Sequence, residues 1–238
     1  MVADMRTTIT IMPERPSGTG NPQSLVRLMT WLSPGFPVGG FAYSGGLEAA
    51  VAEGHVSGAD DLAIWLETLL DAGSLRNDAI LLAEAHRAFA DADRLAEVAA
   101  LAAALAGSAE RYHEAVNQGD AFVAAVSAWP QPVLALLDPS TAYSIAVGAV
   151  AAANGVALAD ALVAFLQAQC AQLVSAAIRL SVIGQRQAVA ILAGLEGQLI
   201  AKAQAVEPMG LEDLGSATVL ADLLSMRHET QYSRLFQS

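Results

Sequence analysis

The chain has 238 residues, with 24 acidic and 12 basic side chains, a formal net charge of −12 and a pI near 4.6. So acidic a chain repels phosphate, which argues against nucleic-acid binding. A single cysteine, Cys170, excludes a disulfide scaffold and a cysteine-ligated zinc site. Because 54% of the residues are hydrophobic, the chain can bury a core and is not expected to be disordered.

The first 24 residues differ from the rest of the chain. They contain three prolines and two glycines and no apolar signal-peptide core, so we expect 1–24 to be a mobile N-terminal tail. Two later stretches, 139–159 and 161–178, carry no charge and approach the length of a membrane helix. The turn pair Asn154-Gly155 interrupts the first, three glutamines lie in the second, and alanine dominates both. We therefore expect buried helices of a cytoplasmic protein that does not span a membrane.

Apolar residues recur at helical spacing along almost the whole chain. In 57–72 the leucines and Trp65 share one face, and Ser57 with Asp60 resembles a capping box at the start. These patterns predict an all-α fold: a compact single-domain bundle of about ten helices with short connections, over residues 25–231. Further helices are expected at about 24–32, 43–53, 76–90, 93–106, 108–128, 141–153, 158–182, 185–204 and 216–230.

A glycine-rich segment, 33–48 (SPGFPVGGFAYSGGLE), interrupts this helical pattern. Free backbone amides ahead of a helix attract anions, which suggests a phosphate site. However, Phe41 and Ala42 stand where a P-loop needs Lys and Ser or Thr, so we do not expect a nucleotide there. A tightly shaped loop would explain the glycines, but it would not explain three aromatic residues in so short a segment.

Metal and catalytic motifs are scarce. The only E-x-x-H pattern is Glu110 to His113, whereas carboxylate-bridged di-iron bundles use two such motifs and two further glutamates. No nucleophile motif of the G-x-S-x-G type is present. We therefore expect that the protein is not an enzyme and that it has neither a cofactor nor a metal site. The alternative is an α-helical metal carrier or enzyme that uses Glu110 and His113.

Negative charge is concentrated after the glycine-rich segment. No Lys or Arg lies between Arg27 and Arg76. This charge pattern indicates either a solvated helix face or an acidic surface for a basic partner, and the sequence leaves both open. The six acidic residues of the region are Glu48, Glu53, Asp60, Asp61, Glu67 and Asp71.

The end of the chain combines a helix with an unusual terminal segment. Three leucines within 220–224 form an apolar stripe, but the next positions of that stripe are Arg227 and His228. The segment 232–238, called the tail below, contains Tyr, Arg, Leu and Phe, which are residue types that anchor interfaces. The tail either packs loosely on its own domain or binds a partner.

The glycine-rich segment and the ending RHETQYSRLF together resemble the urease accessory protein UreF family. The similarity continues through 77–87, 143–154 and 174–185, so it covers nearly everything after residue 24. The family's terminal L-F-R-S appears here as Leu235-Phe236-Gln237-Ser238, without the basic residue. The family's loop pattern P-x-G-x-[FY]-x-[YS]-S-x-G-L-E is matched by Pro37, Gly39, Phe41, Tyr43, Ser44, Gly46, Leu47 and Glu48.

The resemblance implies a non-enzymatic, all-α chaperone that forms a homodimer and assists nickel insertion during urease maturation. It implies three partners: the accessory protein UreD (also called UreH), the nickel-carrying GTPase UreG and the urease apoprotein. By motif, Tyr43 and Arg234 match positions tied to partner recruitment, and the tail is expected to become ordered when UreD binds. The expected partner-binding residues are Tyr43, Ser44, Gly46, Glu48, Arg227, His228, Glu229, Tyr232, Arg234, Leu235 and Phe236.

Overall fold

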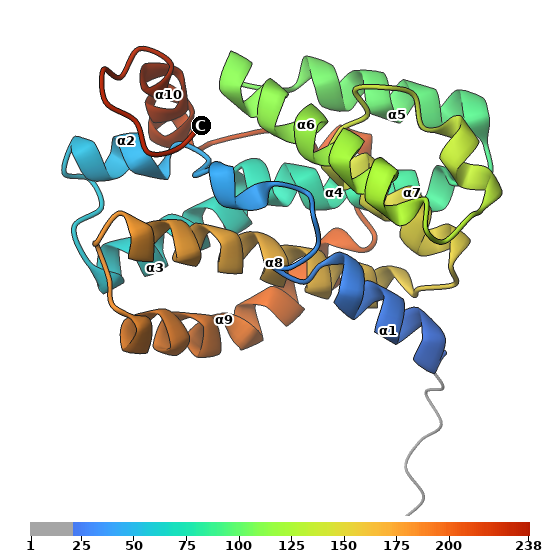
Figure 1. Ribbon diagram of the computed structural model, residues 1–238, viewed down its shortest axis with the longest axis horizontal. Helices are drawn as coiled ribbons and strands as arrows, with labels where there is room; N and C mark the ends of the chain where they lie inside the picture. The colour runs from blue at the N-terminus through green and yellow to red at the C-terminus, as the bar shows by residue number, and fades with distance from the viewer. Residues whose placement is uncertain (1–20) are drawn as a thin grey trace, which may run out of the picture.

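The computed structural model describes residues 21–238 and is all-α over that range, which confirms the predicted fold class (Figure 1). Ten α-helices and three short 3-10 helices follow one another without a strand in the described residues. They are α1 Pro22–Trp31, η1 Gly40–Ala42, α2 Leu47–Ala52, α3 Ala59–Ala72, α4 Ser74–Ala88, α5 Ala92–Ala104, α6 Ala109–Val126, η2 Pro132–Leu136, α7 Tyr143–Ala153, α8 Leu158–Arg179, α9 Gln185–Val206, η3 Leu211–Asp213 and α10 Val219–His228.

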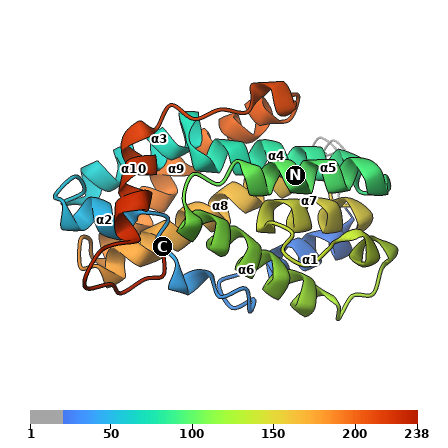
Figure 2. The same cartoon turned by 90° about the horizontal axis from the view of Figure 1, so that it is seen from above.

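Helix α7 lies at the centre of the bundle, between α4 and α6 (Figure 2). Every residue from Tyr143 to Ala151 is buried, which agrees with the continuous apolar sequence of this helix. Glycines allow the neighbouring backbones to approach closely. A Cβ on Gly148 would stand 2.3 Å from the carbonyl oxygen of Leu82 in α4. A Cβ on Gly119 of α6 would stand 1.9 Å from the carbonyl oxygen of Thr141. These contacts fix how α4, α6 and α7 pack.

Two helices, α8 and α9, are long and apolar enough to cross a membrane by length and composition alone. Half of the most apolar part of α8 is buried inside the protein, as expected for a core helix. In α9 the buried share of the corresponding part is 28%. The other uncharged stretch, 139–159, is not one helix, because α7 ends at Ala153 and Gly155 adopts a left-handed φ of 68°. These helices therefore give only weak support for a membrane span.

Several helix boundaries differ from the sequence prediction. The expected helix 43–53 begins only at Leu47, as α2, because Gly45 and Gly46 adopt φ angles of 59° and 83° that are incompatible with a helix. The expected cap at Ser57 is wrong: its amide and hydroxyl both donate to Asp61 Oδ2, at 2.9 and 2.6 Å. Gly58 occupies the N-cap position of α3 instead.

The two ends of the described chain also differ from expectation. Helix α1 begins at Pro22, where Asn21 Oδ1 accepts a hydrogen bond from the amide of Gln23 at 3.0 Å. Residues 22–24 are therefore helical, and the rest of the expected N-terminal tail, 1–20, lies outside the described residues. The C-terminal tail turns back after α10 and ends beside α2 and α6, inside the fold (Figure 1).

Candidate functional site

The glycine-rich segment forms a shaped loop that treats its three aromatic residues differently. Phe36 packs against the core aromatics Phe122 and Trp129, and Tyr43 is buried with its hydroxyl accepting from Asn117 Nδ2 at 3.1 Å. Phe41 instead points into solvent and is 75% exposed. The exposed aromatic is therefore not needed for packing.

Two glycines hold Phe41 in this exposed position. Gly39 adopts a left-handed φ of 72°, and a Cβ on Gly40 would stand 2.5 Å from Gln172 Oε1 of α8. A side chain at position 39 would be strained by this φ, whereas one at position 40 would require the Gln172 side chain to move, so Gly39 does most to fix the loop around η1. Phe41 was not among the predicted site residues, although it directly follows these glycines and occupies the aromatic position of the loop pattern.

The last two residues of the chain lie beside the start of α2. The amide of Ser44 donates to the carbonyl oxygen of Ser238 at 2.9 Å, and the amide of Gln237 donates to Ala42 at 2.8 Å. The hydroxyl of Ser238 donates to Glu114 Oε2 at 3.0 Å. Ser238 is fully buried by these contacts, so loop and tail form one unit.

A partly buried ion cluster contacts Ser238 through Glu114. Arg111 pairs with Glu114 at 2.7 Å and with Asp78 at 3.2 Å. Burial raises the pKa of Asp78 to about 6. The positive charge of Arg111 lowers this pKa, whereas repulsion from Glu114 raises it further. The two carboxylates raise the pKa of Arg111, and Glu114 has the larger effect. Arg111 is thus a permanent positive charge that positions Glu114 to accept from the tail.

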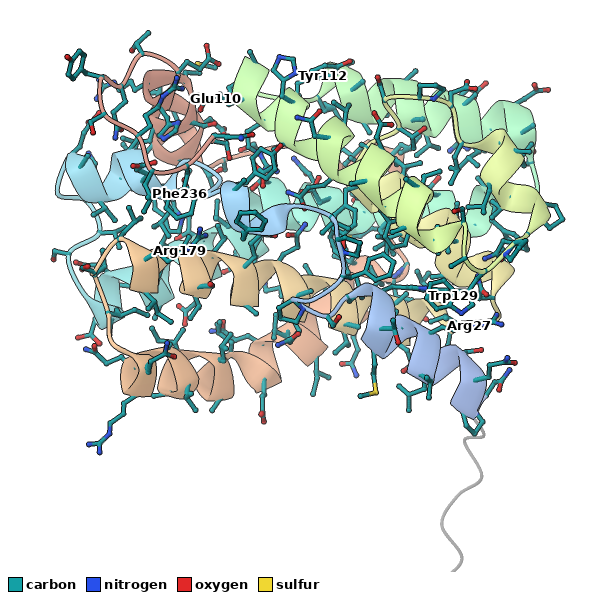
Figure 3. All side chains as sticks on the ribbon, viewed as in Figure 1. Arg27, Glu110, Tyr112, Trp129, Arg179 and Phe236 are labelled. Carbon is teal, nitrogen blue, oxygen red and sulfur yellow. The ribbon has the colours of Figure 1, made fainter. Side chains whose placement is uncertain are left out.

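Glu48, in the first turn of α2, holds the backbone of the tail. Its Oε1 accepts from the amide of Leu235 at 2.7 Å and its Oε2 from the amide of Phe236 at 2.9 Å. Burial on its own raises the pKa of Glu48, but hydrogen bonds from these amides and from His228 bring it below the ordinary value. Phe236 is buried, and the guanidinium of Arg179 lies 4.2 Å from its ring centre (Figure 3).

The side chain of His228 connects the tail to two helices and is completely buried. Its Nε2 lies 3.0 Å from Glu48 Oε2 on α2, and its Nδ1 lies 2.6 Å from Glu110 Oε2 on α6. The other oxygen of Glu110, Oε1, accepts from Arg234 Nη1 of the tail at 2.7 Å. These four side chains form the group called the His228 cluster below.

The apolar face of α10 is not the one that the leucine pattern predicts. Leu224 and His228 point inward with Ser225, whereas Leu220 and Leu223 are 48% and 46% exposed. Ser225 packs closely on the start of α2, since a Cβ on Gly46 would stand 3.2 Å from the amide of Ser225. In this orientation part of the leucine stripe faces solvent.

The eleven predicted site residues divide into two groups. Six of them are buried within the chain, so they build the surface and hold the tail: Tyr43, Ser44, Gly46, Glu48, His228 and Phe236. Five are exposed and remain predicted contact residues: Arg227, Glu229, Tyr232, Arg234 and Leu235. Tyr232 is fully exposed and Leu235 is 60% exposed. The sequence prediction missed four exposed apolar residues on α10: Val219, Leu220, Leu223 and Met226.

The E-x-x-H motif does not form a metal site. Glu110 is occupied by His228 and Arg234, while His113 is exposed with its ring near Tyr112. Among residues 21–238, no group of three or more His, Cys, Asp or Glu side chains could hold a metal ion.

Most of the six acidic residues between 48 and 71 contact other side chains of the protein. Glu48 is buried, and Glu53 pairs with Arg227 at 2.6 Å. Asp71 pairs with Lys202 at 2.5 Å, and Glu67 accepts from Gln198 at 3.0 Å. These acidic side chains therefore act mainly in contacts within the chain.

Comparison with known proteins decides the family. The sequence model described as UreF matches residues 56–196, more than half of the chain. The chain belongs to the UreF family of urease accessory proteins. It is similar to the urease accessory protein UreF of Rhizobium etli (strain CIAT 652), with 56% identity over 216 residues, 91% of this chain and 97% of the relative. It is also similar to UreF of Mesorhizobium japonicum, with 54% identity over 227 residues, 95% of this chain and all of the relative.

Family membership gives the chain a role in urease maturation as an accessory protein of a chaperone family, not an enzyme. The matched range of the UreF model, 56–196, includes neither the glycine-rich segment nor the tail. The UreF match therefore rests on the helical bundle, and the functions of the loop and the tail are argued from their geometry.

Proposed function

We propose that this UreF-family protein is a cytoplasmic scaffold for nickel insertion into urease. It would bind UreD through α10 and the tail, and the resulting complex would recruit the GTPase UreG and act on the urease apoprotein. The observation that carries the proposal is the exposed apolar surface at the C-terminal end, supplied by Leu220, Leu223, Tyr232 and Leu235. A rigid fold that exposes such residues is typical of a protein interface.

The docked tail gives this surface a defined shape. The contacts of Phe236 and Ser238 hold the tail on the domain, and Tyr232 and Leu235 remain outside. Because the exposed anchors are fixed before a partner arrives, binding loses less conformational entropy than it would with a free tail. Arg234 keeps part of its guanidinium in solvent while pairing with Glu110, so it remains available for UreG recruitment.

We expect Leu223→Asp to abolish co-purification of UreD. A charge in the centre of an apolar interface weakens binding by about 2 kcal/mol or more, roughly 30-fold. Helicity and thermal stability should stay unchanged, because Leu223 is 46% exposed. The measurement is affinity pull-down of UreD with circular dichroism. The matched control is Leu105→Asp at the end of α5, which is 43% exposed. Normal UreD binding by the Leu223 variant would contradict the proposed surface.

We also propose that a second copy of the chain covers the groove between α1 and α8. The groove encloses about 1300 Å³, and its lining is mainly apolar. On its rim, Leu25 and Met29 of α1 are 56% and 66% exposed, and Val163 and Ala164 of α8 lie in its wall. A concave apolar surface of this kind suits a symmetric interface, in which the same patch is used twice.

We expect Met29→Glu to convert the dimer to a monomer, because the substitution places a charge in both copies of the symmetric contact. Size-exclusion chromatography with light scattering measures the mass directly. Ile64→Glu on α3 is the control, since Ile64 is 62% exposed on another helix. A Met29→Glu protein that keeps the mass of the unmodified protein would place the dimer contact elsewhere.

A further inference from the structure

The two carboxylates that hold the tail contact the same imidazole. Glu48 accepts the amides of residues 235 and 236, and Glu110 accepts the guanidinium of Arg234. His228 lies between them, with one ring nitrogen facing each carboxylate, at 3.0 and 2.6 Å. The position of the tail therefore depends on what the imidazole can donate.

A neutral imidazole has one N–H and one acceptor nitrogen, while an ionised carboxylate only accepts. A carboxyl oxygen faces each ring nitrogen, so when both carboxyls are ionised both nitrogens donate and the ring is an imidazolium. The net charge of the His228 cluster is consistent with a protonated ring. With a protonated ring, Glu48, Glu110, Arg234 and His228 sum to zero. With a neutral ring, the buried cluster carries one uncompensated negative charge, which is unfavourable at low dielectric.

We propose that His228 is a protonation-dependent latch for the tail: the imidazolium joins Glu48 to Glu110 and holds residues 234–236, and loss of its second proton releases them. The proposal rests on the proposed function, because it regulates the same UreD-binding surface. The docked tail displays Tyr232 and Leu235, so a rise in pH that releases the tail would also weaken UreD binding.

The surrounding charges do not supply a substitute for the imidazolium. Arg234 already binds Glu110, and Arg227 is paired with Glu53 on the surface. Arg179 of α8 covers the ring of Phe236, 4.2 Å from its centre. The remaining acidic and basic side chains on the elements packed around the cluster are Asp222 and Glu229 on and after α10, Arg111, His113, Glu114 and Asp120 on α6, and Asp160 on α8, with Arg111 and Glu114 paired with each other.

The test follows the tail of the full-length protein without any partner. A fluorescent dye is attached at Ser233→Cys, an exposed position in the tail. The native Cys170 is buried, and burial raises the pKa of its thiol to about 12, so it does not compete for the dye. Dye anisotropy is recorded from about pH 6 to about pH 9, a range that brackets deprotonation of an imidazole. A dye at Ser127→Cys, at the end of α6, controls for changes elsewhere.

We expect the anisotropy of the tail dye to fall as pH rises, while that of the control dye stays constant. In His228→Gln the anisotropy should be low at every pH. Both N–H groups of the glutamine amide are on one nitrogen and its oxygen only accepts, so it cannot donate to a carboxylate on each side as the two ring nitrogens do. In Glu110→Gln it should not fall with rising pH. The glutamine nitrogen can donate to Nδ1 of a neutral ring, while the glutamine oxygen still accepts from Arg234.

A tail dye whose anisotropy is independent of pH in the unmodified sequence overturns the latch, and so does a Glu110→Gln protein with the same pH dependence as the unmodified sequence. These outcomes stand even if His228→Gln fails to fold. Since no partner is present, they leave the proposed function untouched. Pull-down of UreD at both ends of the pH range then tests that function separately.

Discussion

Substitution of Gly148 by alanine is expected to destabilise the protein by at least about 3 kcal/mol, near the upper end of measured overpacking effects. The added Cβ would stand 2.3 Å from the carbonyl oxygen of Leu82 and within 3.2 Å of its Cα, and backbone atoms cannot rotate away as a side chain can. Helices α4 and α7 would have to separate, which opens the core. For a chain of this length, the melting temperature should fall by roughly 6 to 12 °C.

Thermal unfolding followed by circular dichroism measures this effect, and Gly194→Ala is its matched control. Gly194 also lies within a helix, α9, but nothing lies within 4 Å of a Cβ placed there. Alanine in that position should stabilise the protein by about 0.5 to 1 kcal/mol, because glycine loses more backbone entropy in a helix. Equal melting temperatures for the two variants would show that the contact between α4 and α7 can relax.

The helices were predictable because apolar spacing and glycine or proline breaks are local properties of the sequence. Helix α7 was expected at 141–153 and runs from Tyr143 to Ala153, and α9 was expected to begin at residue 185 and does. The failures include both local and tertiary effects. Ser57 has the right residue type for a cap, but its hydroxyl donates to Asp61 four residues on, whereas the late start of α2 accompanies the close approach of Gly46 to Ser225 of α10.

The candidate site was predictable in composition but not in arrangement. The sequence singled out the loop and the tail as unusual, because neither fits a helical period. It could not show that Glu48 and Leu235, 187 residues apart, share a hydrogen bond. The same holds for His228, which appeared as a polar interruption of an apolar stripe. Its two carboxylate partners come from α2 and α6, and only folding brings them together.

Replacement of Glu48 by alanine is expected to release the tail and abolish urease activation. The variant loses the acceptor for two backbone amides, and His228 is left with an unsatisfied buried ring nitrogen. Breaking one partner of a buried ion pair costs about 3 to 5 kcal/mol. If the docked fraction of the tail falls to about 1%, the apparent affinity for UreD falls roughly 100-fold.

Urease activity of cells supplied with nickel measures the functional loss, and dye anisotropy at Ser233→Cys measures the release. Glu53→Ala is the control on the same helix: its ion pair with Arg227 is solvent-exposed, so the effect should be within about 1 kcal/mol. Full urease activation by Glu48→Ala, with the tail released, would show that docking of the tail is not required for function.

Because the pKa of Glu48 is lowered, docking of the tail gains a dependence on pH in the unmodified protein. This dependence is absent from Glu48→Ala. A carboxyl whose pKa is lower in the folded protein than in the unfolded chain contributes its full stabilisation above the unfolded pKa. That stabilisation is lost as pH falls through the folded value. The tail should therefore also loosen in acid, below the ordinary carboxyl range. Together with the imidazolium latch, this confines the docked tail to an interval of pH, because docking requires Glu48 ionised and His228 protonated at the same time.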